Sequence, residues 1–251
     1  MEYILLFFVA LIANFFSALA GGGAGLIQFP VLIFLGLPFG TALATHKVAS
    51  VALGVGATTR HLRESHFNGK FCLLILCTGV PGVILGARSI LQVPEHIAQM
   101  ALGILTVGLG LYSFVKKDLG QHYQPKHIDR LGLSLGGLAI FIIGFLNGSL
   151  TSGTGLFLTL WLIHWFGMDY KRAVAYTLVL VGLVWNFTGA VTLGLIGTIK
   201  WDWVPALLAG SFIGGYLGAH LSIKKGNQLI KRAFEVITVL MGVSLMIKTL
   251  V

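Results

Sequence analysis

Two glycine clusters, about half a chain apart, are the residues whose spacing most directly indicates chemistry. One is Gly21-Gly22-Gly23-Ala24-Gly25-Leu26, and the other is Thr151-Ser152-Gly153-Thr154-Gly155-Leu156. Each interrupts a long apolar run, so each is expected to end one helix and begin another inside a membrane. The start of a helix presents backbone N–H groups without acceptors and the positive end of the helix dipole. Two such starts that converge would form an anion-binding site.

The candidate binding residues of these clusters are Gly22, Gly23, Gly25, Ser152, Gly153, Thr154 and Gly155. The hydroxyl groups of the second cluster would add hydrogen-bond donors to the backbone N–H groups. The alternative interpretation is that the glycines only let helices pack closely. The occurrence of both clusters at matched positions of the two halves favours a binding site.

Polar side chains within apolar segments complete the candidate site. Lys47 lies inside a predicted span, where a lysine normally has a partner. The acidic residues all fall at or near predicted span ends, so a bound anion would supply the missing charge. The alternative is that Lys47 extends to the membrane interface. Thr45, His46, Gln28 and Asn186 are the other candidates, and an asparagine could equally hold two helices together.

The composition excludes several classes of protein. With 56% hydrophobic and 10% charged residues, the chain is neither a soluble enzyme nor disordered. The net charge of +9 comes from residues between apolar runs, which argues against nucleic acid as a partner. Cys72 and Cys77 have no metal-site or disulfide spacing, and no motif implies a cofactor or a metal. Glu235, one turn after Lys231, is interpreted as half of a solvated ion pair at a helix end.

The apolar runs predict an all-α polytopic membrane protein. Residues 2–36 as one helix would extend roughly 53 Å, well beyond a hydrocarbon core of about 30 Å. The glycines must therefore turn the chain, with a helix to about Ala20 and a return helix from Ala24 to Leu35. The elements expected after this hairpin are spans at about 41–60, 70–90 and 96–115, a polar connector, a second broken hairpin at 132–166, and spans at about 172–195, 202–221 and 230–250.

The second half repeats the first. Gly36-Leu37-Pro38-Phe39 aligns with Gly167-Met168-Asp169-Tyr170, and Leu85-Gly86-Ala87-Arg88 aligns with Leu217-Gly218-Ala219-His220. A hairpin followed by three spans reverses the side of the chain, so the halves should be inverted. The predicted parts are a first transmembrane repeat (1–115), a cytoplasmic connector (116–130) and a second, inverted repeat (131–251).

The basic residues support this inversion. In an inverted arrangement most lysines and arginines lie on one face, and only Arg88, Lys200 and Lys248 lie on the other. Positive residues mark the cytoplasmic side of a membrane protein. We therefore expect a multi-pass protein of the bacterial inner membrane with both termini on the periplasmic or extracellular side.

These features resemble the sulfite exporter TauE/SafE family. The shared elements are a glycine cluster followed five positions later by a proline (Gly25 to Pro30), an Ala-x-x-Thr-His-Lys run that ends at Lys47, and the Asn68-Gly69-Lys70 turn before the next span. The similarity covers nearly the whole chain, including the duplication. Many relatives have asparagine where this chain has His46, and the second glycine cluster is shorter here. The resemblance implies a transporter of sulfur-containing anions such as sulfite or sulfoacetate.

The expected function is secondary transport of a small anion by alternating access, with export as the expected direction. Export of one negative charge from a cell with a negative interior gains about 2.3 kcal/mol per 100 mV. Uptake by the same fold and a passive anion channel are the alternatives. An intramembrane hydrolase that uses Ser152 and His220 lacks a nucleophile elbow and an orienting acid, so we do not expect an enzyme. The expected partners are a small anion and the lipid bilayer, and a homodimer is compatible with the sequence.

Overall fold

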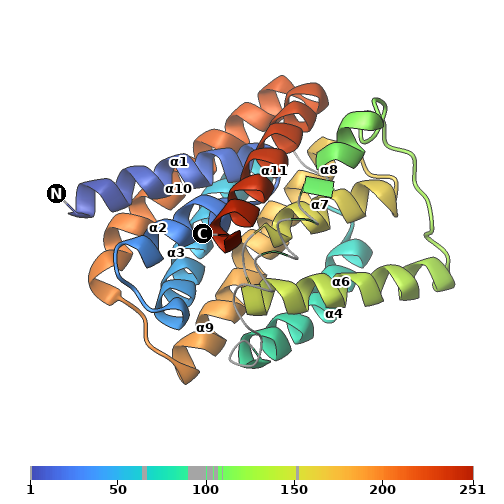
Figure 1. Cartoon of the computed structure of the whole chain (residues 1–251). Helices are drawn as coiled ribbons and strands as arrows, with labels where there is room; N and C mark the ends of the chain where they lie inside the picture. Colours follow the sequence, from blue (N-terminus) through green and yellow to red (C-terminus); the bar gives the residue numbers. More distant parts are fainter. Residues whose placement is uncertain are drawn as a thin grey trace.

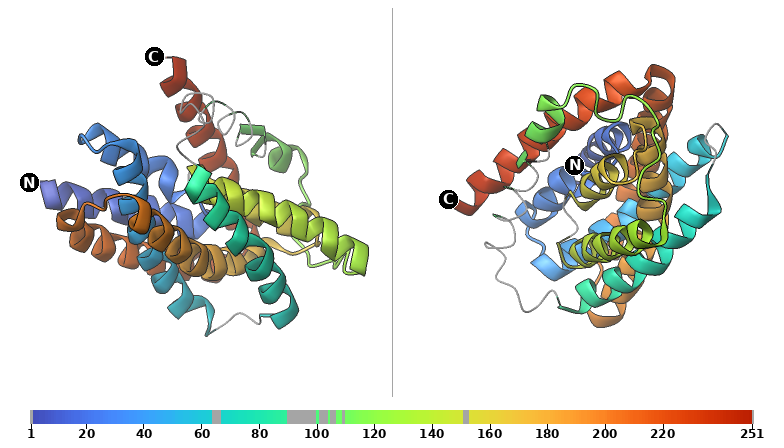
Figure 2. Two further views of the ribbon diagram at one scale, coloured as in Figure 1. Left: turned by 90° about the horizontal axis from the view of Figure 1, so that it is seen from below. Right: turned by 90° about the vertical axis from the view of Figure 1, so that its right-hand side faces the viewer.

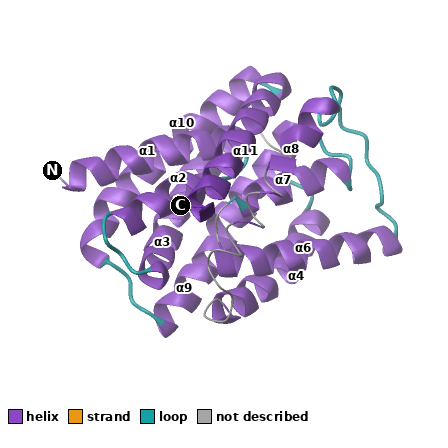
Figure 3. Ribbon diagram, viewed as in Figure 1, coloured by secondary structure: helices purple, strands orange, loops and turns teal. Residues whose placement is uncertain are grey.

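The chain folds into helices joined by short connections, and the described part of the chain contains no strand (Figures 1 and 3). The computed structural model describes residues 2–63, 67–89, 100, 104, 107–108, 110–150 and 153–250, with the backbone alone for 241–242, 244–245 and 248–250. The all-α expectation is confirmed. The predicted span at 96–115 lies mostly outside the described residues, although residues 110–115 are helical.

The predicted helices correspond closely to the observed ones. The first half contains α1 (Glu2–Ala20), α2 (Ala24–Phe34), α3 (Phe39–His61) and α4 (Gly69–Ser89). The second half contains α6 (Arg130–Leu150), α7 (Thr154–His164), α8 (Tyr170–Tyr176), the π-helix η2 (Thr177–Trp185), α9 (Asn186–Ile196), the short 3₁₀ helix η3 (Trp201–Trp203), α10 (Val204–Lys225) and α11 (Asn227–Leu250). The boundaries at Ala20 and Ala24 are those expected from the first glycine cluster.

Several helices have the length and composition of membrane spans. Five stretches of the described chain qualify, namely Glu2–Ala20, Gly69–Ser89, Arg130–Leu150, Tyr170–Ile196 and Trp201–Lys225. The apolar helices α2 and α7 have 11 residues each. At that length each is roughly 16 Å long and would cross only about half of a hydrocarbon core. The chain therefore combines full spans with two half-length helices.

The two half-length helices begin where helices from opposite ends of the molecule meet. In Figure 1, α1 runs inward from the end that carries the N-terminus, and α6 runs inward from the end that carries the connector. The views in Figure 2 show the same arrangement. Both glycine breaks therefore lie in the interior. The exact inverted relation of the two halves and their boundaries at 115 and 131 stay predictions.

Close helix packing depends on other glycines. On α10, an added methyl group at Gly214 or Gly218 would collide with the carbonyl oxygen of Leu11 or Phe15 on α1. On α4, Gly82 meets the backbone of α6 in the same way. Small residues of this kind allow backbones to approach within a membrane. Close packing through glycine is therefore found at positions outside the two glycine clusters as well.

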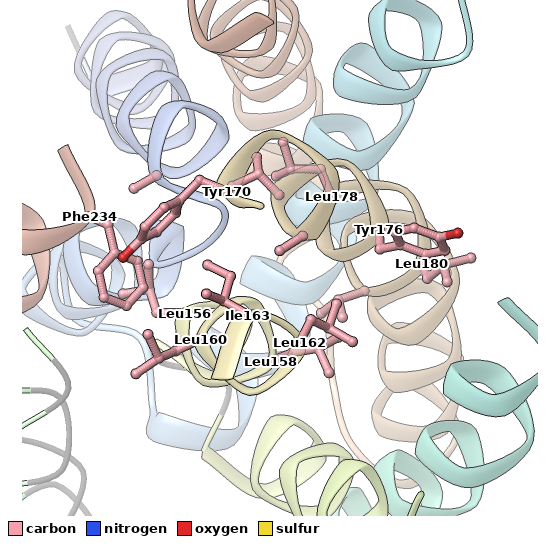
Figure 4. Close-up of a cluster of buried hydrophobic side chains, with 14 of the residues drawn as sticks. Leu156, Leu158, Leu160, Leu162, Ile163, Tyr170, Tyr176, Leu178, Leu180 and Phe234 are labelled. Carbon is pink, nitrogen blue, oxygen red and sulfur yellow. The ribbon is translucent and has the colours of Figure 1, made fainter. Parts of the chain in front are cut away.

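Helix α7 is buried on nearly every side. Leu156, Leu158, Leu160 and Leu162 are at most 4% exposed. Figure 4 shows these side chains projecting around the helix, with Leu178 of η2 and Phe234 of α11 among their neighbours. A helix that is apolar all round lies in a protein core or in the membrane, and these low exposures show that α7 is enclosed by other helices. This enclosure fixes the start of α7 in the centre of the molecule.

The span predicted at 172–195 is not a regular α-helix throughout. Its central residues, Thr177–Trp185, form a π-helix between α8 and α9. Next to it, an added methyl group on Gly54 of α3 would collide with the backbone of Gly182. Wide helical turns of this kind are rare and occur frequently at functional sites.

Candidate functional site

The two glycine breaks contact each other through their backbones. An added methyl group at Gly22 would lie 2.6 Å from the carbonyl carbon of Gly155, and one at Gly155 would lie 3.0 Å from the Cα of Gly22. The residues that precede the half-helices, Gly23 and Gly153, both have a left-handed backbone, with φ of 100° and 75°. Neither helix start is capped by a side chain of this preceding residue. The starts of α2 and α7 therefore lie next to each other.

A cavity of about 40 Å³ lies at this contact. A single water needs about 10–15 Å³ on this scale, so the cavity can hold an ion of a few atoms. Seven of the residues predicted for the site line it: Gly22, Gly23, Gly25, His46, Thr154, Gly155 and Asn186. The remaining lining residues are Ser17, Ala24, Ser50, Leu53, Asn147, Thr177, Leu178, Val181 and Gly182.

Lys47 lies directly behind the cavity wall. It is fully buried, and its ammonium group donates to Asn147 Oδ1 at 2.6 Å and to Asn186 Oδ1 at 3.1 Å. Asn147 also donates through Nδ2 to Thr154 Oγ1 at 2.8 Å, which links the lysine to the first residue of α7. None of the ion pairs found among the described residues includes Lys47. The positive charge is therefore held by neutral amides next to the cavity.

Two buried polar atoms at the cavity lack a hydrogen-bond partner among the described residues. They are Ser17 Oγ and His46 Nδ1, and both side chains are 2% exposed. The other ring nitrogen of His46, Nε2, shares a hydrogen bond of 3.2 Å with Ser50 Oγ. Buried polar groups without a partner are costly and rare, and a bound water or ion is one way to satisfy them. The cavity is thus prepared for a polar occupant.

Four of the predicted residues do not line the cavity. Gln28 accepts a hydrogen bond of 2.9 Å from Asn14 Nδ2 in a separate polar cluster between α1 and α2. Thr45 Oγ1 accepts a hydrogen bond of 3.0 Å from the backbone N–H of Lys200. Gly153 precedes α7 but does not line the cavity. Lys47 does not line the cavity either, and it is linked to the cavity wall by its hydrogen bonds to Asn147 and Asn186. Ser152 lies outside the described residues.

Ser17, Ser50 and Thr177 were not predicted as site residues. Thr177 could have been found from the repeat, because the offset of 131 that aligns Ala42 with Ala173 also aligns His46 with Thr177. Ser17 and Ser50 carry no comparable signal, because single serines are common in membrane helices. Within the described part of the chain no cluster of three metal-ligating side chains occurs.

The fold and the site together define a polytopic α-helical membrane protein with a small polar cavity between two broken helices. The chain belongs to the sulfite exporter TauE/SafE family, whose model matches residues 6–245.

Relatives that match this chain over nearly its whole length support this assignment. The chain is 28% identical to the probable membrane transporter protein YfcA of Escherichia coli K12, over 96% of this chain and 88% of that protein. It is 30% identical to a probable membrane transporter protein of Haemophilus influenzae, over 94% and 91% of the two chains. A third relative, the probable membrane transporter protein YunE of Bacillus subtilis, is 23% identical over 98% and 97%. No solved structure matches the chain. These findings establish a membrane transporter family.

Proposed function

We propose that the protein is a secondary transporter that exports a small sulfur-containing anion, of the sulfite or organosulfonate type, by alternating access. The observation that carries this proposal is the contact between the two glycine breaks around a polar cavity. Helix starts favour anions, whereas cations seek helix C-termini and carbonyl groups. The similarity to a sulfite exporter family supports the choice of sulfur-containing anions.

The groups around the cavity suit an oxyanion. Backbone N–H groups at the start of α2 and α7 would donate to the oxygens of the anion, apart from those of Leu26 and Leu156, which already donate to the carbonyl groups of Gly23 and Gly153. His46 Nδ1 and Ser17 Oγ, which have no partner among the described residues, would provide further hydrogen bonds. Lys47 would balance the negative charge through Asn147 and Asn186 without direct contact. A cavity of about 40 Å³ favours compact anions over large organic ones.

Alternating access needs a route from this cavity to each side of the membrane in turn. The two breaks belong to different halves of the chain, so movement of one half against the other would separate Gly22 from Gly155 on one side. Transporters built from repeats commonly move in this way. We place the connector face in the cytoplasm and both termini outside, in accordance with the distribution of basic residues.

The membrane potential supports export as the direction of transport. Expulsion of one negative charge gains about 2.3 kcal/mol per 100 mV when the cell interior is negative, so export requires no coupling ion. Uptake of the same anion would have to overcome this energy.

A flux panel in proteoliposomes tests the proposal. Purified protein is reconstituted, and the uptake of sulfite, sulfate, thiosulfate and methanesulfonate is measured with and without a pH gradient. We expect saturable flux of at least one of these anions that responds to an imposed membrane potential. Saturation and exchange of labelled substrate would identify a carrier. Currents that do not saturate would indicate a channel, and the absence of flux for every anion would contradict the assigned substrate class.

A further inference from the structure

A second pocket lies where the connector passes the end of α7. It has a volume of about 590 Å³. Its lining includes Lys116, Lys117 and Lys126 together with His122 and His164. The anion cavity shares none of these residues, so this pocket is a separate site. Transport through the central cavity does not account for it.

The walls of the pocket are fixed by hydrogen bonds. The backbone N–H groups of Gln124 and Lys126 donate to the carbonyl groups of Gly167 and Phe166 at 2.8 Å and 3.2 Å. His164, at the end of α7, shares a hydrogen bond of 2.9 Å with the hydroxyl group of Tyr112. The connector is therefore held against α7 instead of passing freely over the surface. A pocket formed in advance loses little entropy when a ligand binds.

The floor of the pocket is tied to α11. Lys231 donates to the carbonyl groups of Ser113 and Lys116, and it forms an ion pair of 2.7 Å with Glu235. The two side chains of this pair are only 11% and 15% exposed. The expectation of a solvated pair at these positions is therefore wrong, because residues 113–116 cover it. Lys231 is satisfied in this network, so its charge does not serve the pocket.

The pocket itself carries an excess of positive charge. Asp118 also lines it, so three lysines and one aspartate leave two net positive charges, without counting the histidines. None of the ion pairs found within the described residues includes Lys116, Lys117 or Lys126. Unpaired lysines around one hollow attract an anionic group with several oxygens.

The neighbouring residues place the pocket at the membrane boundary. Phe114 and Val115, directly before Lys116, are 70% and 73% exposed. Both residues end the predicted span at 96–115, where exposed apolar side chains of this size are expected to face the lipid chains. With this predicted span, the lysines that follow it are expected at the depth of the lipid headgroups. Clusters of lysine next to a membrane helix attract anionic lipids, at about 1 kcal/mol per residue near the surface.

We propose that this pocket binds the phosphate headgroup of an anionic phospholipid. Lys116, Lys117 and Lys126 contact the phosphate oxygens, and the acyl chains lie along the apolar surface that includes Phe114 and Val115. The bound lipid would hold the connector against the end of α7 and the start of α11. A soluble phosphate compound has the same headgroup chemistry but lacks the chains, so it should bind much less tightly.

Lipid retention by the full-length protein tests this proposal. The protein is purified in detergent with equal amounts of phosphatidylglycerol and phosphatidylcholine, and the bound lipids are counted by native mass spectrometry. The test variant combines Lys116→Gln, Lys117→Gln and Lys126→Gln. The control variant combines Lys70→Gln, Lys224→Gln and Lys225→Gln, which removes the same charge from other exposed positions. The melting temperature of each variant is measured to check that the variant is folded.

We expect the wild type and the control variant to retain phosphatidylglycerol preferentially, and the test variant to lose this preference by at least about tenfold. Equal retention of the two lipids by the wild type would overturn the proposal. An equal loss in both triple variants would also overturn it, because the pocket would then not be the site. Binding of glycerol phosphate to the lipid-free protein is measured as well. If glycerol phosphate binds as tightly as phosphatidylglycerol, the pocket is a site for soluble phosphates and not for lipids.

Discussion

At the scale of single residues, the charge of Lys47 is held by Asn147 and Asn186 instead of a carboxylate. The two amide oxygens accept two of the three N–H groups of the ammonium but do not neutralise its charge. A buried ion of this kind is costly unless an opposite charge approaches. The cavity lined by the same two asparagines could admit such a charge. This arrangement explains why an anion would enter a cavity enclosed by membrane helices.

Replacement of Lys47 by methionine tests this role. Methionine keeps much of the side-chain volume but removes the charge. Asn147 and Asn186 then lose their hydrogen-bond donor at this position. We expect sulfite flux in proteoliposomes to fall at least tenfold, which corresponds to about 1.4 kcal/mol. Lys224→Met, at an exposed position near the end of α10, is the matched control and should transport normally. Normal flux in a correctly folded Lys47→Met protein would remove the lysine from the mechanism.

The sequence could predict Lys47, His46 and Asn186 because polar residues within apolar spans are conspicuous. It could not predict that Gln28 and Thr45 have partners away from the cavity. Their distance from the cavity depends on the rotation of α2 and α3, which is set by packing and not by local sequence.

At the scale of the elements, the glycine breaks have two physical requirements. The left-handed backbone at Gly23 and Gly153 starts each half-helix, and the absence of side chains at Gly22 and Gly155 lets the two breaks touch. Both requirements favour glycine. The helix bounds around the breaks were therefore predictable from the sequence.

Alanine substitutions separate these requirements. Gly22→Ala introduces a left-handed alanine, with a strain of about 1–3 kcal/mol, and a collision with the backbone of Gly155. We expect a lower melting temperature and no transport. Gly155 does not have a positive φ, so alanine adds no backbone strain there. Its added methyl group would lie 3.0 Å from the Cα of Gly22, which is a milder collision. We therefore expect Gly155→Ala to fold but to transport more slowly.

Gly40→Ala is the control for both variants, because no atom lies within 4 Å of its added methyl group. Melting temperatures are measured by fluorescence in detergent, and flux is measured in proteoliposomes. If Gly155→Ala and Gly22→Ala both matched Gly40→Ala in flux, the contact between the breaks would have no part in transport.

The π-helix η2 could not be predicted in this way. Its residues, Thr177–Trp185, have the composition of an ordinary apolar span. Its geometry is associated with the close crossing of Gly182 and Gly54, which lie far apart in the sequence. Tertiary packing of this kind leaves no local signal.

At the scale of the whole molecule, α1 and α6 enter from opposite ends and bring the two breaks together in the interior (Figure 1). The duplication in the sequence predicted two equivalent breaks. It could not give the distance between them, because that distance depends on how all the helices pack. The polar cavity at their contact is what makes a shared anion site physically reasonable.

The most direct test is the location of a bound anion. Selenite has the shape and charge of sulfite, and its selenium atom gives an anomalous X-ray signal. Crystals of the full-length protein grown with selenite should show an anomalous peak in the cavity, within hydrogen-bond distance of Gly23 and Asn147. The proposed site would be contradicted if the protein transports selenite but the anomalous peak lies elsewhere and the cavity is empty.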